Sequence, residues 1–257
     1  MSHRLLDAWK SVAHSRAPFI LKGDGAALGS EGILWNSLDE SAFLDSDQFL
    51  RKSDQFFMGL VPQPYLGRVL NASVYILMLN PGFSSLDLYA ESNEKAFKSA
   101  LLEQLDGTRP NLYMDPRFHW TGGFQYWTGK LSRHVDKLGE IFARKPSNVL
   151  SFIADEVAIL ELVPYHSARC PLSPGSMRRL ESVRLMREFF AEYVLPRCAN
   201  DECSVVVSRG AGVWKASPAK NVLVYSPQQA RAAHFGLQSE GGRVILNRLV
   251  RSAEAYW

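Results

Sequence analysis

The stretch Val74-Tyr75-Ile76-Leu77-Met78-Leu79 runs without a break into Asn80-Pro81-Gly82. An apolar run of this length, bounded by turn-forming residues, predicts a buried β-strand over 74–79. Pro81 and Gly82 fix the turn that follows, and the glycine lets a ligand approach the backbone closely. In an α/β sheet, ligands bind in the crevice beyond the carboxyl ends of the strands. The stretch therefore indicates both a class of fold and a place for a site.

Three further apolar runs predict strands at residues 157–162, 204–207 and 221–224. Apolar residues with helical spacing follow at 174–194, where Ser173 is the expected N-cap, and at 243–255. Strands that alternate with helices favour an α/β fold with a mostly parallel sheet. We expect a three-layer α/β/α arrangement around a central sheet of four strands.

The length of 257 residues fits one large domain with insertions, so we predict a single domain over 1–257. Within it we expect an N-terminal extension, residues 1–67, that contains a helix over 5–14. Residues 88–145 are rich in aromatic side chains, and we interpret them as an insertion that shapes or covers the site. The alternative is a second hydrophobic cluster packed beneath a long loop.

Composition is that of an ordinary globular protein, with 46% hydrophobic and 21% charged residues. No apolar run is long enough to span a bilayer and the first residues do not resemble a signal peptide, so we expect a cytoplasmic protein without a membrane partner. Cys170, Cys198 and Cys203 are too few for a disulfide framework, and their spacing matches no recognised zinc pattern. We predict no metal site. The net charge of +3 says little about partners.

Three short segments at predicted strand ends together resemble the uracil-DNA glycosylase superfamily. Residues 79–82 look like the Asn-Pro-Gly turn of its mismatch-specific and single-strand-selective branches, and residues 160–165 match the strand end at which those enzymes read the extruded base. Residues 222–231 lie where the family has a His-Pro-Ser-Pro loop followed by a helix, and residues 205–214 resemble the strand and turn before it. The resemblance spans about 74–236 and leaves out the N-terminal region and the aromatic insertion.

The resemblance implies a monofunctional DNA glycosylase that uses water as its nucleophile and needs no metal, organic cofactor or obligate protein partner. Such an enzyme takes a base out of the DNA stack and holds its Watson–Crick edge. Asn80 lies where the family orients the attacking water, although an amide is a poor base. Positioning and electrostatics would therefore stabilise the sugar cation. The alternative is that Asn80 only caps the turn.

Glu161 departs from the family, whose members place asparagine there. A protonated glutamate can accept a hydrogen bond from the exocyclic amine of cytosine and donate one to its ring nitrogen. Burial favours this form, because it raises the pKa of a carboxyl group. We therefore predict a cytosine-like base as the first preference and an adenine-like base as the second. The alternative is a structural ion pair with Arg169 or Arg209.

Gly82 is a second departure, since the uracil-specific branch carries a tyrosine there that crowds the ring carbon bearing the methyl group of thymine. The glycine leaves room for a base substituted at that carbon, such as a hypermodified cytosine. Removal of a modified base, for example from foreign DNA, is the hypothesis that follows for the biological role.

The third motif departs most, because Val224 stands where the family has histidine. The absence of this histidine favours a second hypothesis, a DNA-binding protein of the same fold without catalysis. Repair of uracil or damaged bases and processing of free nucleosides are further alternatives. The alternative for His166 is a loop residue without a role in the site, and the alternative for Phe83 is a core residue. We expect contacts to the base from Pro81, Gly82, Phe83, Tyr165, His166 and Tyr225, and contacts to DNA from Ser226, Pro227, Gln228, Gln229, Arg231 and Arg209.

Overall fold

The computed structural model describes residues 3–30, 35–48 and 54–257, which divide into two compact units. The first unit comprises residues up to 64, 79–106 and 161–189, and the second comprises 65–78, 107–160 and 190–257. Three parts of the predicted N-terminal extension, residues 1–2, 31–34 and 49–53, lie outside the described residues. The turn after residue 78 and the segment after residue 160 both belong to the first unit.

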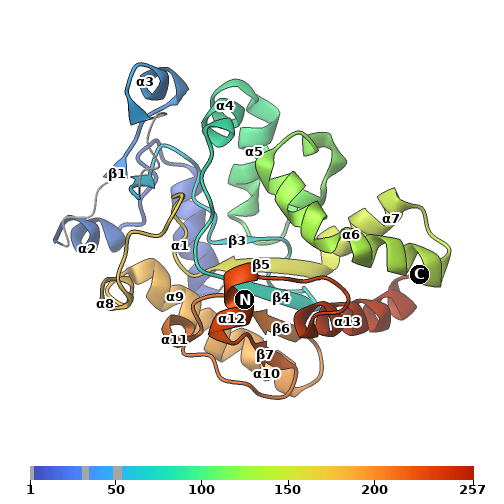
Figure 1. Ribbon diagram of the computed structural model, residues 1–257. Coiled ribbons are helices and arrows are strands. Elements are labelled where there is room, and N and C mark those ends of the chain that lie inside the picture. Colours follow the sequence, from blue (N-terminus) through green and yellow to red (C-terminus); the bar gives the residue numbers. More distant parts are fainter. Residues whose placement is uncertain (1–2, 31–34, 49–53) are drawn as a thin grey trace. The chain divides into compact units, whose positions relative to one another are not determined.

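The main sheet has five strands in the order β3-β5-β4-β6-β7 (Figure 1). Parallel pairing joins β4 to β6 and β6 to β7, and the register places Ile76 beside Val206 and Val206 beside Leu223. The whole of this sheet lies in the second unit except Glu161, the last residue of β5. The strands are β3 (Tyr65–Leu66), β4 (Val74–Met78), β5 (Val157–Glu161), β6 (Ser204–Val207) and β7 (Val222–Val224).

The α/β class and the mostly parallel sheet are confirmed, whereas the prediction of four strands is wrong. The fifth strand, β3, pairs antiparallel with β5, so that Tyr65 lies beside Leu160. Gly67 makes the turn after β3 with a φ of +91°, and a Cβ atom there would lie 2.6 Å from the carbonyl oxygen of Val157. A glycine is required at this position for the chain to pass so close to β5.

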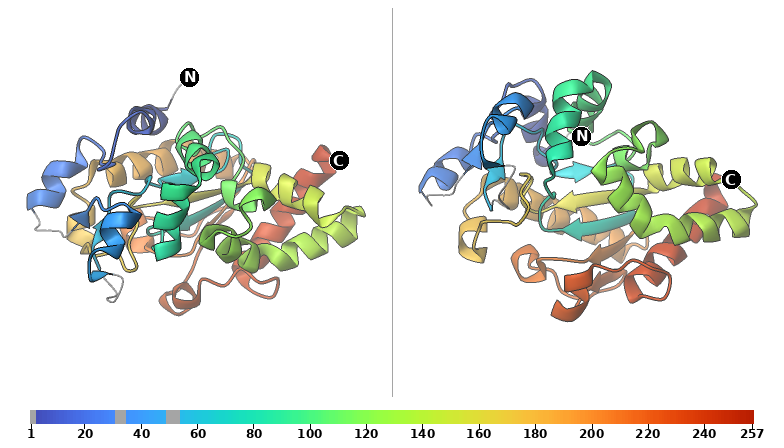
Figure 2. Two further views of the ribbon diagram at one scale, coloured as in Figure 1. Left: turned by 90° about the horizontal axis from the view of Figure 1, so that it is seen from above. Right: turned by 45° about the horizontal axis from the view of Figure 1, so that its top comes forward.

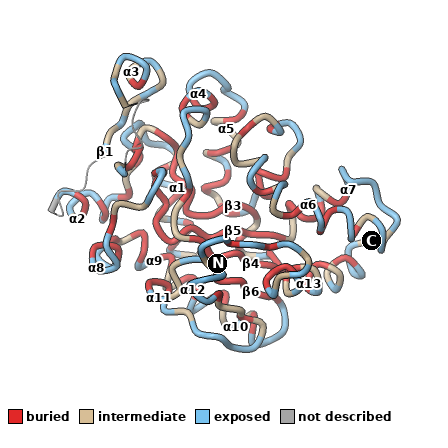
Figure 3. Tube along the Cα trace, in the orientation of Figure 1, coloured by how far each residue is buried: buried red, intermediate tan, exposed pale blue. Residues whose placement is uncertain are grey.

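Every residue of β4, β5 and β6 is buried, as the red strands in Figure 3 show. Strands buried on both faces read as continuous apolar runs, which is why the sequence predicted them well. Helix α13 (Glu240–Tyr256) packs against β4, β6 and β7. It matches the helix predicted over 243–255, and Ser239 caps it by accepting a hydrogen bond from Gly242 N at 3.0 Å.

The other helices of the second unit include α6 (Gly122–Phe142) and α7 (Pro146–Glu156), which pack against each other. Both views in Figure 2 show them side by side. None of the described helices is long and apolar enough to cross a membrane. The remaining helical segments of this unit are η2 (Leu112–Met114), η3 (Pro116–Phe118), η4 (Phe190–Val194), α10 (Leu195–Ala199), α11 (Ala211–Trp214) and α12 (Pro227–Ala232).

The aromatic segment 88–145 is mostly helical and is divided between the units at residue 106. Four of its aromatic side chains are buried, and Tyr126 is 41% exposed. The buried aromatics belong to the cores of the two units, which favours the alternative of hydrophobic packing for them. They are Phe97 in the first unit and Tyr113, Phe118 and Trp127 in the second.

The prediction of one helix over 174–194 is wrong. The chain forms α8 (Pro174–Met177), begins again as α9 (Glu181–Phe189), and continues into the π-helix η4 and then α10. Pro196 lies in the first turn of α10 and has no N–H for the carbonyl four residues earlier, so regular α-helical bonding cannot continue through it.

Asp24 fixes the start of α9 from a distant part of the first unit. Its buried carboxylate accepts hydrogen bonds from Ser182 N at 3.0 Å and from the Tyr165 hydroxyl at 2.6 Å. Burial raises the pKa of Asp24, and these hydrogen bonds oppose the rise. The other elements of this unit are α1 (Arg4–Ala13), α2 (Asp24–Ser30), β1 (Trp35–Asn36), α3 (Glu40–Leu44), β2 (Phe56–Phe57), α4 (Ser85–Asn93) and α5 (Lys95–Gln104), and β1 pairs parallel with β2.

Candidate functional site

The turn after β4 and the segment after β5 run beside each other within the first unit. Val163 N donates to Leu79 O at 2.8 Å, and Ser167 N donates to Pro81 O at 3.3 Å. These two backbone hydrogen bonds bring the predicted residues Asn80 and Pro81 next to the stretch that begins with Glu161. The first unit thus contains two of the three strand ends from which we expected chemistry, and the third, residues 222–231, belongs to the second unit.

The side-chain amide of Asn80 is held in one orientation. Its Nδ2 donates to Pro81 O at 2.9 Å and to Ser167 Oγ at 3.0 Å, and it lies 3.4 Å from Ser167 O. Two of these partners are carbonyl oxygens, which only accept, so the nitrogen and not the oxygen must face them. No residue in the described part of the chain donates a hydrogen bond to Asn80 Oδ1. This half-buried oxygen is therefore available to accept one from water.

His166 is buried and contacts the same turn. Its Nδ1 lies 2.8 Å from Gly82 O and its Nε2 lies 3.1 Å from Val61 O, and the side chain is 3% exposed. A neutral imidazole can donate from one nitrogen only, whereas the doubly protonated ring can donate to both carbonyls. We predicted a contact from His166 to the base; in the structure its two nitrogens contact backbone.

Two acidic residues on α4 that the sequence analysis did not select lie close to His166 and Val61. Glu91 is buried and its Oε2 accepts a hydrogen bond from Val61 N at 2.9 Å. Burial raises the pKa of Glu91 to about 8, against the opposing effects of the Val61 N–H and Lys98. Burial also raises the pKa of Asp87, which the charge of His166 opposes. The sequence signal for Glu91 was its position three residues after Leu88 on the buried face of a helix.

Glu161 ends β5 with a side chain that is 5% exposed, as the prediction of a buried carboxyl group requires. Its backbone N donates to Pro64 O at 2.9 Å, which extends the pairing of β5 with the chain before β3. Tyr165, four residues on, turns its hydroxyl toward the N-terminal segment, where it accepts a hydrogen bond from Leu21 N at 3.1 Å and donates to Asp24. Tyr165 thus contributes to packing within the first unit.

Gly82 and Phe83 differ in how much space surrounds them. A Cβ atom built on Gly82 has no described atom within 4 Å, so the position faces open space. One face of the half-buried Phe83 ring is covered by Phe57, with centroids 3.5 Å apart and an angle of 4°. The edge of Phe43 approaches the same ring at 6.0 Å. Only the remaining surface of Phe83 can contact a ligand.

The loop after β7 belongs to the second unit, and several of its side chains form hydrogen bonds within the protein. Tyr225 is buried, and its hydroxyl donates to His234 O. Ser226 caps α12 and exchanges hydrogen bonds with Gln229, whose side chain also donates to Glu240 at 3.0 Å. Ser226 and Gln229 therefore already have partners within the protein.

Four other predicted DNA contacts are exposed: Pro227, Gln228, Arg231 and Arg209. Within the described chain, the side chains of Gln228 and Arg231 form no hydrogen bond or ion pair. Arg209 follows β6 and lies close enough to Lys130 to lower its pKa, although the partial burial of Lys130 contributes more. Lys130 Nζ donates to Ala233 O at 2.8 Å. The second unit thus presents exposed positive charge near α12.

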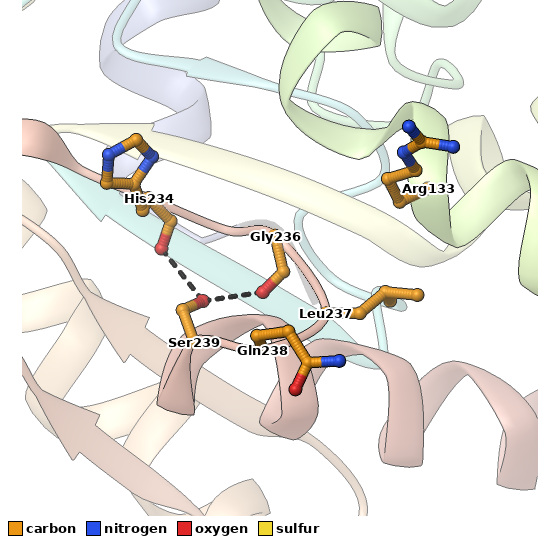
Figure 4. Close-up of a pocket in the computed structure, with 6 residues that line it drawn as sticks. All are labelled: Arg133, His234, Gly236, Leu237, Gln238 and Ser239. Atoms are coloured by element: carbon orange, nitrogen blue, oxygen red, sulfur yellow. Dashed lines mark hydrogen bonds between the residues drawn. The ribbon is translucent and has the colours of Figure 1, made fainter.

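A cavity of about 620 Å³ lies beside the loop between α12 and α13. Figure 4 shows that Arg133 comes from α6 and the other five lining residues from the loop, where Ser239 Oγ donates to His234 O and Gly236 O. None of the predicted site residues lines this cavity. The six residues are Arg133, His234, Gly236, Leu237, Gln238 and Ser239.

Comparisons with protein-family models, curated proteins and solved structures found no significant match to this chain.

Proposed function

We propose that the protein is a monofunctional DNA glycosylase that hydrolyses the N-glycosidic bond of an extruded, cytosine-like base. The observation that carries the proposal is the orientation of Asn80, whose Nδ2 is fixed by Pro81 and Ser167 while Oδ1 is left to hold a water molecule. Asn80 stands two residues before an open position, Gly82, and belongs to the same unit as the buried Glu161. A water acceptor, open space and a buried acid are what base excision by water needs.

The proposed reaction breaks the bond between C1′ of the sugar and the ring nitrogen of the base. Positive charge develops on the sugar, and the water held by Asn80 adds its oxygen to C1′. The water loses one proton to solvent, because an amide is too weak a base to take it. The departing base gains a proton, for which protonated Glu161 is the proposed donor.

The preferred base follows from Glu161 and Gly82 together. A protonated carboxyl group matches the amine and ring nitrogen of cytosine, and the absence of a side chain at position 82 leaves room for a substituent on the ring. A hypermodified cytosine, for example in foreign DNA, is the substrate class that we propose. The three-layer α/β/α arrangement of the resembled family and a cytoplasmic location belong to the same proposal.

The test is a single-turnover assay of base release, read by mass spectrometry, on DNA that contains uracil, cytosine, 5-substituted and glycosylated cytosines or damaged purines. We expect release of a cytosine-like base by the wild-type protein and at least a 100-fold slower release by Asn80→Ala. Asn148→Ala changes an exposed asparagine of α7 and is the matched control. Equal rates for Asn80→Ala and the control would contradict the proposal.

A DNA-binding protein without catalysis is the second candidate, and Tyr225 is the observation that favours it. Val224 occupies the place of the family histidine, and the neighbouring Tyr225 hydroxyl is already bonded to His234 O. This candidate predicts salt-sensitive DNA binding without release of any base. Release of uracil alone would indicate a repair glycosylase, and activity on free nucleosides without DNA would indicate a nucleoside-processing enzyme.

A further inference from the structure

Two buried cysteines in the second unit have their sulfur atoms in contact. Cys198 lies on α10 and Cys203 directly precedes β6, and their Sγ atoms are 3.3 Å apart. Both are free thiols. Because a disulfide bond is about 2.05 Å long, a displacement of little more than ~1 Å separates this pair from bonding distance.

Two arginines place positive charge around Cys203. Arg248 donates to Ser204 Oγ at 3.2 Å and to Cys203 O at 3.4 Å, and it is buried. Arg197 comes from α10, the helix that carries Cys198, and donates to Ala72 O at 3.1 Å. The positive charges of both arginines lower the pKa of Cys203, which favours a thiolate over a thiol.

The environment makes the two sulfurs unequal. The pKa of Cys203 is lowered because the Cys198 thiol donates a hydrogen bond to it and because Arg197 and Arg248 add positive charge, against burial and the charge of Glu202. The pKa of Cys198 is raised, first by its hydrogen bond to Cys203 and then by burial. When one proton leaves the pair, the negative charge is therefore favoured on Cys203 over Cys198.

The chain between the two buried cysteines is itself exposed. Residues 199–202 are all exposed, and Asp201 has a φ of +64°, in the left-handed region that residues with a side chain rarely adopt. Local opening of this segment, which breaks the hydrogen bonds from Arg248 and Asn221 to Asp201, would give a small oxidant access to the two sulfurs.

We propose that Cys198 and Cys203 are a redox modification site that forms a reversible disulfide with hydrogen peroxide as the oxidant. The Cys203 thiolate attacks one peroxide oxygen, the O–O bond breaks, hydroxide leaves, and a sulfenic acid forms on Cys203. The Cys198 sulfur then attacks the Cys203 sulfur, the S–O bond breaks, and the hydroxyl group leaves as water with the Cys198 proton. The two sulfurs lose two electrons and the peroxide gains them.

The proposal is independent of the glycosylase function and is tested on the full-length wild-type protein. The protein is reduced, freed of reductant, treated with hydrogen peroxide and mapped by mass spectrometry of non-reduced peptides. We expect one cross-link, between Cys198 and Cys203, that disappears on treatment with dithiothreitol. Half-buried Cys170 is the internal control and should stay outside any cross-link. Oxidation of the pair to sulfinic acids without a cross-link would overturn the proposal.

Two variants assign the roles of the sulfurs with dimedone, which labels sulfenic acids. Cys198→Ala should accumulate a dimedone adduct on Cys203, whereas Cys203→Ala should give no adduct on Cys198. Cys170→Ala is the matched control and should form the same cross-link as the wild type. An adduct on Cys198 in Cys203→Ala would overturn the order of steps. If either variant fails to fold, the cross-link in the wild-type protein still decides the proposal.

Discussion

Asn80 Nδ2 lies 3.0 Å from Ser167 Oγ, so the turn after β4 and the segment after β5 are joined by side chains as well as by backbone. The serine is 1% exposed, which makes this a contact shielded from water. A hydrogen bond in such surroundings restricts the rotation of the asparagine amide more than a solvent-exposed one. Ser167 thereby determines, together with Pro81 O, where Asn80 Oδ1 points.

The first prediction concerns Ser167→Ala. The variant should slow the release of base by about 10- to 100-fold, because Asn80 loses one of the partners that orient its amide and water positioning loosens. Single-turnover base release measures the effect, and Ser99→Ala in the exposed part of α5 serves as control. An unchanged rate in Ser167→Ala would show that the contact does not position Asn80.

The second prediction concerns Glu91, whose pKa burial raises to about 8. The folded state keeps this proton between pH 4.5 and 8 while the unfolded state loses it, so Glu91 lowers the free energy of unfolding as pH rises through that window. Glu91→Gln should remove this dependence. Between pH 4.5 and 8, its free energy of unfolding should therefore rise by about 3–5 kcal/mol relative to that of the wild type.

Urea unfolding of wild type and Glu91→Gln at several pH values between 4.5 and 8.5 measures the difference. Glu254→Gln, at an exposed glutamate of α13, is the control and should show no such trend. Parallel curves for the wild type and Glu91→Gln would mean that Glu91 ionises normally in the folded protein.

The third prediction concerns His134, which is fully buried on α6. Its Nε2 lies 3.0 Å from Gly242 O, and within the described residues its Nδ1 has no hydrogen-bond partner. Burial lowers the pKa of this imidazole below 6.5. The unfolded state therefore takes up the proton first, and the contribution of His134 to stability is present above pH 6.5 and is lost as pH falls below it.

His134→Gln should reduce the loss of unfolding free energy between pH 7.5 and 5. Its absolute stability at pH 7.5 should fall by about 1–3 kcal/mol, because the imidazole that fills this buried site is replaced by a side chain of another shape. Urea unfolding at both pH values gives the comparison, with exposed His119→Gln as control. The hypothesis fails if His134→Gln loses as much stability on acidification as the wild type.

The fourth prediction compares two glycines. Gly82→Ala should change stability by no more than about 0.5 kcal/mol, because its Cβ faces open space. Gly241→Ala should destabilise by about 1–3 kcal/mol, since a Cβ there would lie 2.1 Å from the Tyr225 hydroxyl oxygen. Urea midpoints of the two variants measure the contrast, and equal losses would contradict it.

Gly82→Leu extends the comparison to the proposed substrate. The leucine should block release of 5-substituted and glycosylated cytosines while sparing unsubstituted cytosine, because its side chain would occupy the space left for the substituent. The same base-release assay distinguishes these outcomes. Equal slowing on small and bulky bases would contradict the steric argument.

Strands β4, β5 and β6 were predictable because every residue in them is buried, so that each appears in the sequence as a continuous apolar run. The short strand β7 was also predicted, although only Val222 in it is buried. Tyr65–Leu66 was not, since two residues have no periodicity and the strand exists only by pairing with β5. The break before α9 also escaped detection, because Met177, Leu180 and Val183 keep helical spacing across it. The cap that starts α9, Asp24, lies far away in the sequence.

For the candidate site, sequence located Asn80 and Glu161 at strand ends but could not choose their partners. Ser167, Glu91 and the two carbonyls that contact His166 come from separate segments, and only the folded first unit brings them together. A pattern along the chain reports burial and turn chemistry, whereas a hydrogen-bond network depends on tertiary contacts.

The carboxylate of Asp24 bonds residues 141 and 158 positions further along the chain. During synthesis, the segment around it must therefore leave the ribosome and wait until Ser182 has emerged before its own buried hydrogen bonds can form. For most of translation this acidic side chain stays hydrated and the apolar face of α1 has no α9 to cover it. Nascent chains arrested before residue 182 should accordingly be the ones most in need of chaperone protection.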